Sequence, residues 1–285
     1  MWWNTDNFAL DVAQAVAVAL PAAGLPLWLE RARRGAWALV LPASIIVAVT
    51  VISLVPASAD VYTWLALIGV PVGCALAFGW AAHGARRPLA VLAVPLLAVA
   101  WIWQDARVGD VATTALILGS CVTLGRLIAG AAPPTIVKLA LIAMAIVDAI
   151  LVFSGELAAP NAVLNAAVPA PGLPQLQTGV YGTSSLGYGD FLSAAVLGAV
   201  FAGERAPQWL LAGVLVLVSL AWDQLFLVVD LLPATVPPAI VLVGWEAWKW
   251  TRLRRGTSPG SGSRRRGPPR RRAGRRGAGR APAAG

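Results

Sequence analysis

The sequence predicts an all-α polytopic membrane protein with about nine transmembrane helices. The chain has 285 residues, of which 58% are hydrophobic and 12% are charged, and its mean hydropathy is +0.73. A soluble domain usually carries about twice that charged fraction. The apolar residues also fall in long runs, and a bilayer core of about 30 Å requires roughly 20 apolar residues per helix. These observations exclude a soluble enzyme.

Nine apolar runs approach or exceed this length. The first six lie within about 8–156, and the last three follow a longer interruption. The predicted helices are 8–29, 36–56, 60–82, 88–104, 110–131, 133–156, 189–203, 207–230 and 232–250. The first run is expected to be a retained helix and not a removed signal peptide, because no basic residue precedes it.

Basic residues fall in every other loop, which is the signature of cytoplasmic loops. The intervening loops contain a single one, Arg107. This alternation predicts an N-terminus outside, a cytoplasmic C-terminus and a place in the cell's inner (plasma) membrane. The basic residues that define it are Arg31, Arg33, Arg34, Arg86, Arg87, Arg126, Lys138 and Arg205.

Positive charge is concentrated at the C-terminus. Residues 252–285 hold twelve arginines and no acid, whereas residues 1–251, the predicted membrane domain, hold 10 basic and 13 acidic side chains. A segment rich in Gly, Pro, Ser and Arg cannot bury a core. We therefore expect a disordered cytoplasmic tail that can contact anionic lipid, and no nucleic-acid binding.

The segment 157–187 interrupts the apolar pattern. It contains four prolines, four glycines and no charged residue. The predicted topology makes it an extracytoplasmic loop of about thirty residues, and irregular loops of this length tend to be functional.

The metal-ligating residues are few. Cys74 and Cys121 both lie within apolar runs, and His83 is the single histidine. No CxxC or HExxH motif is present, so the sequence predicts no disulfide framework, no metal site and no cofactor. His83 is expected to be a satisfied interfacial residue.

Two carboxylates lie where a membrane protein rarely places them, because a charge near the centre of a membrane helix costs several kcal/mol. Asp148 lies inside the sixth predicted helix, and Asp190 opens the seventh. Asp11, Asp60, Asp105 and Asp110 lie near helix ends and are expected to reach water.

Asp148 and Asp190 flank the 157–187 loop and could face each other across a water-filled cleft. Two carboxyl groups at hydrogen-bonding distance share one proton, so one can act as a base toward water while the other donates to a substrate carbonyl. This is aspartic-protease chemistry. Gly187 and Gly189 allow close backbone approach beside Asp190, and the prolines at 233, 237 and 238 loosen the start of the ninth helix.

Together these sites resemble the presenilin and signal peptide peptidase family of GxGD intramembrane aspartyl proteases. That family carries a catalytic aspartate in its sixth helix, a GxGD motif in its seventh and a Pro-Ala-Leu motif in its ninth. The corresponding residues here are Asp148, followed by Val152-Phe153; Gly187-Tyr188-Gly189-Asp190; and Pro233-Ala234-Thr235. Two positions depart from the family pattern, with Val147 in place of tyrosine and Thr235 in place of leucine.

The resemblance implies specific roles. Asp148 and Asp190 would form the catalytic dyad, with Gly187, Tyr188, Gly189 and Phe191 around it and Pro233, Ala234 and Thr235 in the substrate-docking wall. The predicted orientation matches that of signal peptide peptidase and implies type II membrane-protein substrates, such as leftover signal peptides. The short loops suggest a minimal prokaryotic member without partner subunits. An unwound substrate could add as a strand to the 157–187 loop.

Other readings remain open at this stage. Residues 183–190 are similar to a potassium-channel filter of the TVGYGD kind, but the prolines and glycines before them leave no room for a pore helix. A proton-coupled transporter would give a role to Asp223, although no internal repeat supports it. Prepilin peptidases also use two aspartates and GxGD, with a lysine that is absent here. No GxSxG serine-protease elbow is present.

Overall fold

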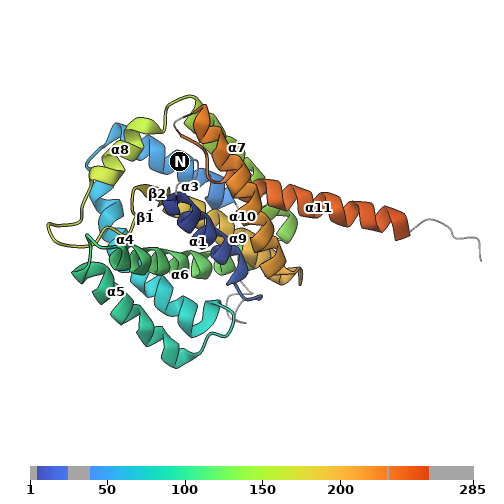
Figure 1. The fold of residues 1–285 in the computed structure, drawn as a ribbon, viewed down its shortest axis with the longest axis horizontal. Helices are drawn as coiled ribbons and strands as arrows, with labels where there is room; N and C mark the ends of the chain where they lie inside the picture. The colour runs from blue at the N-terminus through green and yellow to red at the C-terminus, as the bar shows by residue number, and fades with distance from the viewer. Residues whose placement is uncertain (1–4, 25–38, 230, 257–285) are drawn as a thin grey trace, which may run out of the picture. The chain divides into compact units, whose positions relative to one another are not determined.

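The computed structural model describes residues 5–24, 39–229 and 231–256, and most of them are helical (Figure 1). Residues up to Ala247 form one compact unit, and Trp248–Gly285 belongs to a second. The helical elements are α1 (Thr5–Ala19), α3 (Val40–Leu54), α4 (Ser58–Leu76) with the π-helical turn η2 (Ala77–Ala81), the 3-10 segment η3 (Arg87–Leu92) with α5 (Ala93–Ile102), α6 (Arg107–Ala131), α7 (Pro134–Phe153), α8 (Ala158–Ala166), α9 (Tyr188–Gly203), α10 (Gln208–Asp223) with the 3-10 turn η4 (Gln224–Leu227), and α11 (Val236–Gly256).

Each predicted helical segment contains a helix in the described residues, but several ends differ from the prediction, two of them at prolines and glycines. The helix predicted over 8–29 ends at Ala19, because Pro21 has no N–H to donate and Gly24 adopts a positive φ of 85°. Residues 25–38, which hold the rest of that prediction and the start of the next, lie outside the described residues. The ninth helix begins at Val236 instead of 232, after the first of its three prolines.

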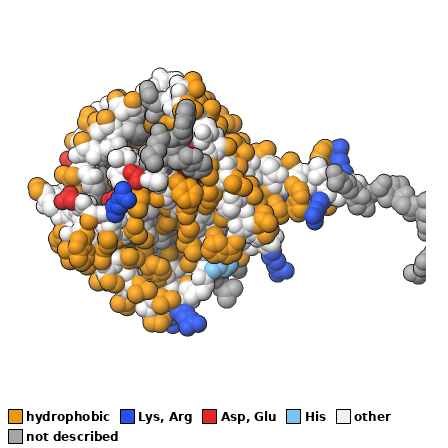
Figure 2. Space-filling view, viewed as in Figure 1, with side chains coloured by type: hydrophobic (Ala, Val, Ile, Leu, Met, Phe, Trp, Pro, Cys, Tyr) orange, Lys and Arg blue, Asp and Glu red, His pale blue; other side chains and the backbone are white. Residues whose placement is uncertain are grey.

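Four of these helical segments are long and apolar enough to cross a membrane by length and composition: Ser58–Ala81, Arg107–Ala131, Pro134–Phe153 and Gln208–Leu227. Hydrophobic side chains cover much of the face of the first unit shown in Figure 2. Exposed examples on α4, α7 and α10 are Trp64, Leu65, Ile68, Ile146, Ile150, Trp209 and Leu217. Apolar surface on this scale fits lipid contact. The chain is therefore a helical protein of membrane-embedded character, and the nine spans, their orientation and the plasma membrane stay predictions.

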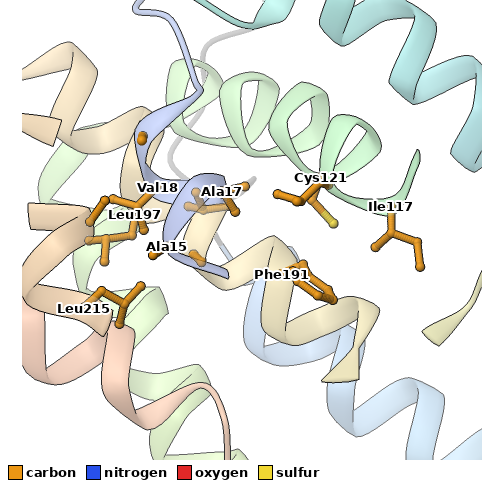
Figure 3. Packing of buried hydrophobic residues seen from close by; sticks show 14 of the residues in the cluster. Ala15, Ala17, Val18, Ile117, Cys121, Phe191, Leu197 and Leu215 are labelled. Carbon is orange, nitrogen blue, oxygen red and sulfur yellow. The ribbon is translucent and has the colours of Figure 1, made fainter. Parts of the chain in front are cut away.

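The core is built around α6 and α9, which pack on each other and on α1, as Figure 3 shows for Cys121, Phe191 and Val18. Small residues permit this packing. A Cβ at Gly125 of α6 would lie 2.6 Å from the Ala195 carbonyl carbon of α9, and one at Gly119 would lie 2.7 Å from the Cys74 Sγ of α4. Close backbone contact at small residues is typical of helix association in membranes.

The segment 157–187 differs from the predicted irregular loop, and it makes the all-α prediction wrong in this region. It contains α8 and an antiparallel hairpin of β1 (Thr178–Tyr181) and β2 (Ser184–Gly187), with Thr178 opposite Gly187 and Tyr181 opposite Ser184. Gly182 supplies the positive φ, 60°, that a two-residue hairpin turn requires.

The hairpin turn is anchored to the first turns of α1 and α6. Asp6 accepts hydrogen bonds from the backbone N–H and the hydroxyl of Thr183, at 3.0 and 3.1 Å, and Asp110 accepts one from the N–H of Gly182 at 3.0 Å. Ser184 also hydrogen-bonds Asn7. Because β2 runs directly into α9, these contacts fix the position at which α9 begins.

Candidate functional site

The two aspartates singled out by the sequence lie on neighbouring helices. Asp148 lies in the second half of α7 and is only 7% exposed. Asp190 lies in the first turn of α9, where its Oδ2 accepts a hydrogen bond from the N–H of Gly187 at 3.1 Å. A carboxylate at this position satisfies one of the amide donors that a helix N-terminus leaves unpaired.

Helices α7 and α9 are in contact, and the carboxyl groups of Asp148 and Asp190 interact electrostatically. The fold thus brings together two acids that are separated in the sequence by the 157–187 segment. Two interacting carboxyl groups titrate as a pair and can hold one proton between them. Such a pair can remove a proton from one reactant and donate a proton to another in the same step.

The third predicted motif also reaches this pair. Thr235, just before α11, donates a hydrogen bond from its hydroxyl to the Oδ2 of Asp148 at 2.6 Å. Thr235 is 3% exposed. The residue that departs from the family's leucine therefore contacts one of the two acids directly.

Gln14 is a site residue that the sequence analysis missed. It lies in α1, is 2% exposed, and donates its side-chain amide to the carbonyl of Ala234 at 2.9 Å and to the carbonyl of Asp190 at 3.3 Å. It thereby connects the 233–235 segment to the first turn of α9. The signal that could have found it is a polar side chain inside an apolar helix, which requires a partner when buried.

The two motif glycines are not equivalent. A Cβ on Gly187 would lie 3.1 Å from the Oδ2 of Asp190, closer than side chains normally approach, so glycine leaves room for the carboxyl group to fold back. A Cβ on Gly189 would find its nearest neighbour, the Cε of Met144, at 3.8 Å, an ordinary contact. The predicted close approach is therefore present at Gly187 and absent at Gly189.

Tyr188 and Phe191 pack α9 against neighbouring elements. The Tyr188 hydroxyl hydrogen-bonds the Ser120 hydroxyl of α6 at 2.7 Å. Phe191 is fully buried, and its ring packs so closely on Gly179 of β1 that a Cβ there would lie 2.7 Å away. Both side chains thus serve packing around the site.

Comparison with protein-family models, curated proteins and solved structures finds no match to this chain.

A second carboxyl pair lies between α1 and α10. Asp11, predicted to reach water, is partly exposed, and its carboxyl group interacts electrostatically with that of Asp223. The pair accounts for Asp223 without placing it beside Asp148.

At a distance along the chain from the two acids and Thr235, α7, α11 and the residue that follows α9 are joined by an ion-pair cluster, here called the clasp. Lys138 of α7 bridges Glu204, which follows α9, and Glu246 of α11, with 2.7 Å between its Nζ and the Oε1 of Glu246. The Lys138 side chain is 15% exposed. The clasp ties the same three segments that meet at the carboxyl pair.

The metal-ligating residue types are dispersed. Within the described ranges, no group of three or more His, Cys, Asp or Glu side chains could hold a metal ion. Cys74 and Cys121 are buried thiols, and the Nε2 of His83 hydrogen-bonds the Oε1 of Gln208 at 2.9 Å.

Proposed function

We propose that this chain is an intramembrane aspartyl protease that cleaves peptide bonds within transmembrane segments or signal peptides, with Asp148 and Asp190 as its catalytic dyad. The observation that carries the proposal is the meeting of three motifs at one place. Asp148 interacts with Asp190 and accepts a hydrogen bond from Thr235, although these residues lie on three separate segments.

In the proposed reaction, one carboxylate takes a proton from a bound water while the water oxygen bonds to the substrate carbonyl carbon. The other carboxyl group donates its proton to the carbonyl oxygen. The resulting tetrahedral intermediate collapses when its nitrogen receives a proton from the dyad, the C–N bond breaks and one of its hydroxyl groups returns a proton to the dyad. The dyad ends with one proton, as it began.

The hairpin offers a way to present the substrate. A peptide bond within a helix is shielded, so the substrate must unwind beside the acids. Strand β2 ends at Gly187, three residues before Asp190. An extended substrate that pairs with the hairpin by edge addition would therefore run toward the dyad. Pro233 and Ala234 would form part of the wall beside it.

A potassium channel is the less favoured alternative. The residues directly before the filter-like segment form strand β1, where a channel would require a pore helix. In addition, Ser184–Gly187 pairs with β1 in the hairpin, which commits its backbone groups to a neighbouring strand.

The test is labelling of the purified protein by a photoreactive, hydroxyl-bearing transition-state analogue of aspartyl proteases. We expect labelling of the wild type, and its loss in Asp148→Asn and in Asp190→Asn. Asp223→Asn is the matched control, because its carboxyl group belongs to the other pair, and it should label normally. Absence of labelling in the wild type, or equal labelling in all variants, would overturn the proposal, and potassium and proton flux into liposomes would then be measured.

A further inference from the structure

The two acids of the proposed dyad differ in the hydrogen bonds that they accept. Asp148 accepts a short hydrogen bond from the hydroxyl of Thr235, at 2.6 Å. Asp190 receives the backbone N–H of Gly187 at 3.1 Å. Hydrogen bonds donated to a carboxylate favour its charged form, and this effect grows with the number and shortness of the bonds.

We propose that Thr235 is a positioning residue that makes Asp148 the proton acceptor of the dyad and leaves Asp190 as the proton donor. This inference rests on the proposed protease function and deepens it, because it gives the two aspartates separate roles. A leucine at this position, as in the family that the sequence resembles, has no side-chain donor to offer.

The surroundings of Thr235 suit this role. Its side chain is 3% exposed, so water competes poorly for Asp148. The preceding carbonyl, that of Ala234, is held by Gln14 at 2.9 Å, and the same amide reaches the Asp190 carbonyl at 3.3 Å. Gln14 therefore sets the position of Thr235 relative to both acids.

The separate roles define the proton path. The Asp148 carboxylate takes a proton from the bound water as the water oxygen bonds to the carbonyl carbon. The electron pair of the carbonyl moves to its oxygen, which receives the proton of Asp190. Asp148 then passes its proton to the leaving nitrogen as the C–N bond breaks, and Asp190 recovers a proton from the intermediate's hydroxyl group.

The experiment measures kcat and KM for a fluorogenic transmembrane-peptide substrate in wild type, Thr235→Val and Thr235→Ser. Valine has the same shape without the hydroxyl. We expect Thr235→Val to lower kcat about 10- to 100-fold with KM unchanged, because the lost bond acts on a charged group. Thr235→Ser, which restores the donor, should stay within a few-fold of the wild type.

Thr123→Val is the matched control. Its hydroxyl is also buried and donates a bond of 2.7 Å, but to the Gly73 carbonyl away from the dyad, so its kcat should match the wild type. Thermal unfolding of each variant is recorded, and Thr235→Ala replaces the valine variant if that variant does not fold.

Three results would overturn the role of Thr235 while leaving the protease intact: an unchanged kcat in Thr235→Val, an effect confined to KM, or an equal loss in Thr235→Ser. Failure of the proposed function has a different signature, because the wild type itself would then neither cleave the peptide nor react with the transition-state probe.

Discussion

The buried amide of Gln14 gives the sharpest prediction about stability. We consider Gln14→Met, which keeps the length of the side chain and removes its donors. The Asp190 carbonyl loses one bond but still accepts the hydroxyl of Ser193 at 2.8 Å. The Ala234 carbonyl loses the 2.9 Å bond from α1. One buried acceptor is therefore left short of a donor, and the variant should lose about 1–3 kcal/mol of stability.

The assay is thermal unfolding in detergent, followed by labelling with the transition-state probe. Gln224→Met is the matched control, because the Gln224 side chain is exposed and bonds only the Leu220 carbonyl of its own helix at 3.0 Å. We expect Gln14→Met to melt at a lower temperature and to label weakly, and Gln224→Met to resemble the wild type. Equal stability of the two variants would refute the reasoning, because Gln14 would then contribute no more than a surface amide.

Three further predictions concern the motif glycines, the clasp and the hairpin anchor. Gly187→Ala should fold but react poorly with the transition-state probe, because its Cβ would lie 3.1 Å from the Oδ2 of Asp190 and displace it. Gly189→Ala should react normally, and weaker labelling of Gly189→Ala than of Gly187→Ala would contradict this geometry. Lys138→Met should lower the free energy of unfolding by about 1–3 kcal/mol, between the values for exposed and buried ion pairs, because it leaves Glu204 and Glu246 without this lysine. Changing these two glutamates to glutamine in the Lys138→Met variant should restore part of that stability, and no recovery would argue against the clasp. The hydrogen bond from the backbone N–H of Thr183 holds the pKa of Asp6 below its ordinary value. The Asp6 carboxylate should therefore stabilise the fold fully above about pH 5 and less as the pH drops below about 4, so the difference in unfolding free energy between wild type and Asp6→Asn should shrink at low pH. A difference that is constant down to about pH 2 would refute this.

Sequence reasoning predicted the features with a strong local signal. Runs of apolar residues mark the helical segments, and Asp148 is conspicuous because residues 139–147 and 149–153 on either side of it are all apolar. The order of the three motifs then predicted which segments would meet, and Thr235 does contact Asp148.

The remaining features depend on partners that are distant in the chain. Gln14 is neutral, so a search for charges passes over it, and its acceptors lie more than 170 residues away. The pairing of Asp11 with Asp223 is equally unreadable from either local sequence. The hairpin strands have only four residues each, too few for a clear alternation of apolar and polar positions, and their anchors are Asp6 and Asp110 in other helices.

The clasp has a mechanical consequence for how a substrate could reach the dyad. At a rise of about 1.5 Å per residue, Asp148 lies roughly 15 Å along α7 from Lys138. The ion pairs of the clasp hold α7 and α11 at one level, and the single hydrogen bond from Thr235 to Asp148 holds them at the other, so they separate more readily at the second. We therefore expect α7 and α11 to part sideways at the dyad end while the spacing at Lys138 stays constant. A transmembrane substrate would then arrive laterally from the lipid, and pairs of spin labels along the two helices would show a displacement that grows with distance from the clasp.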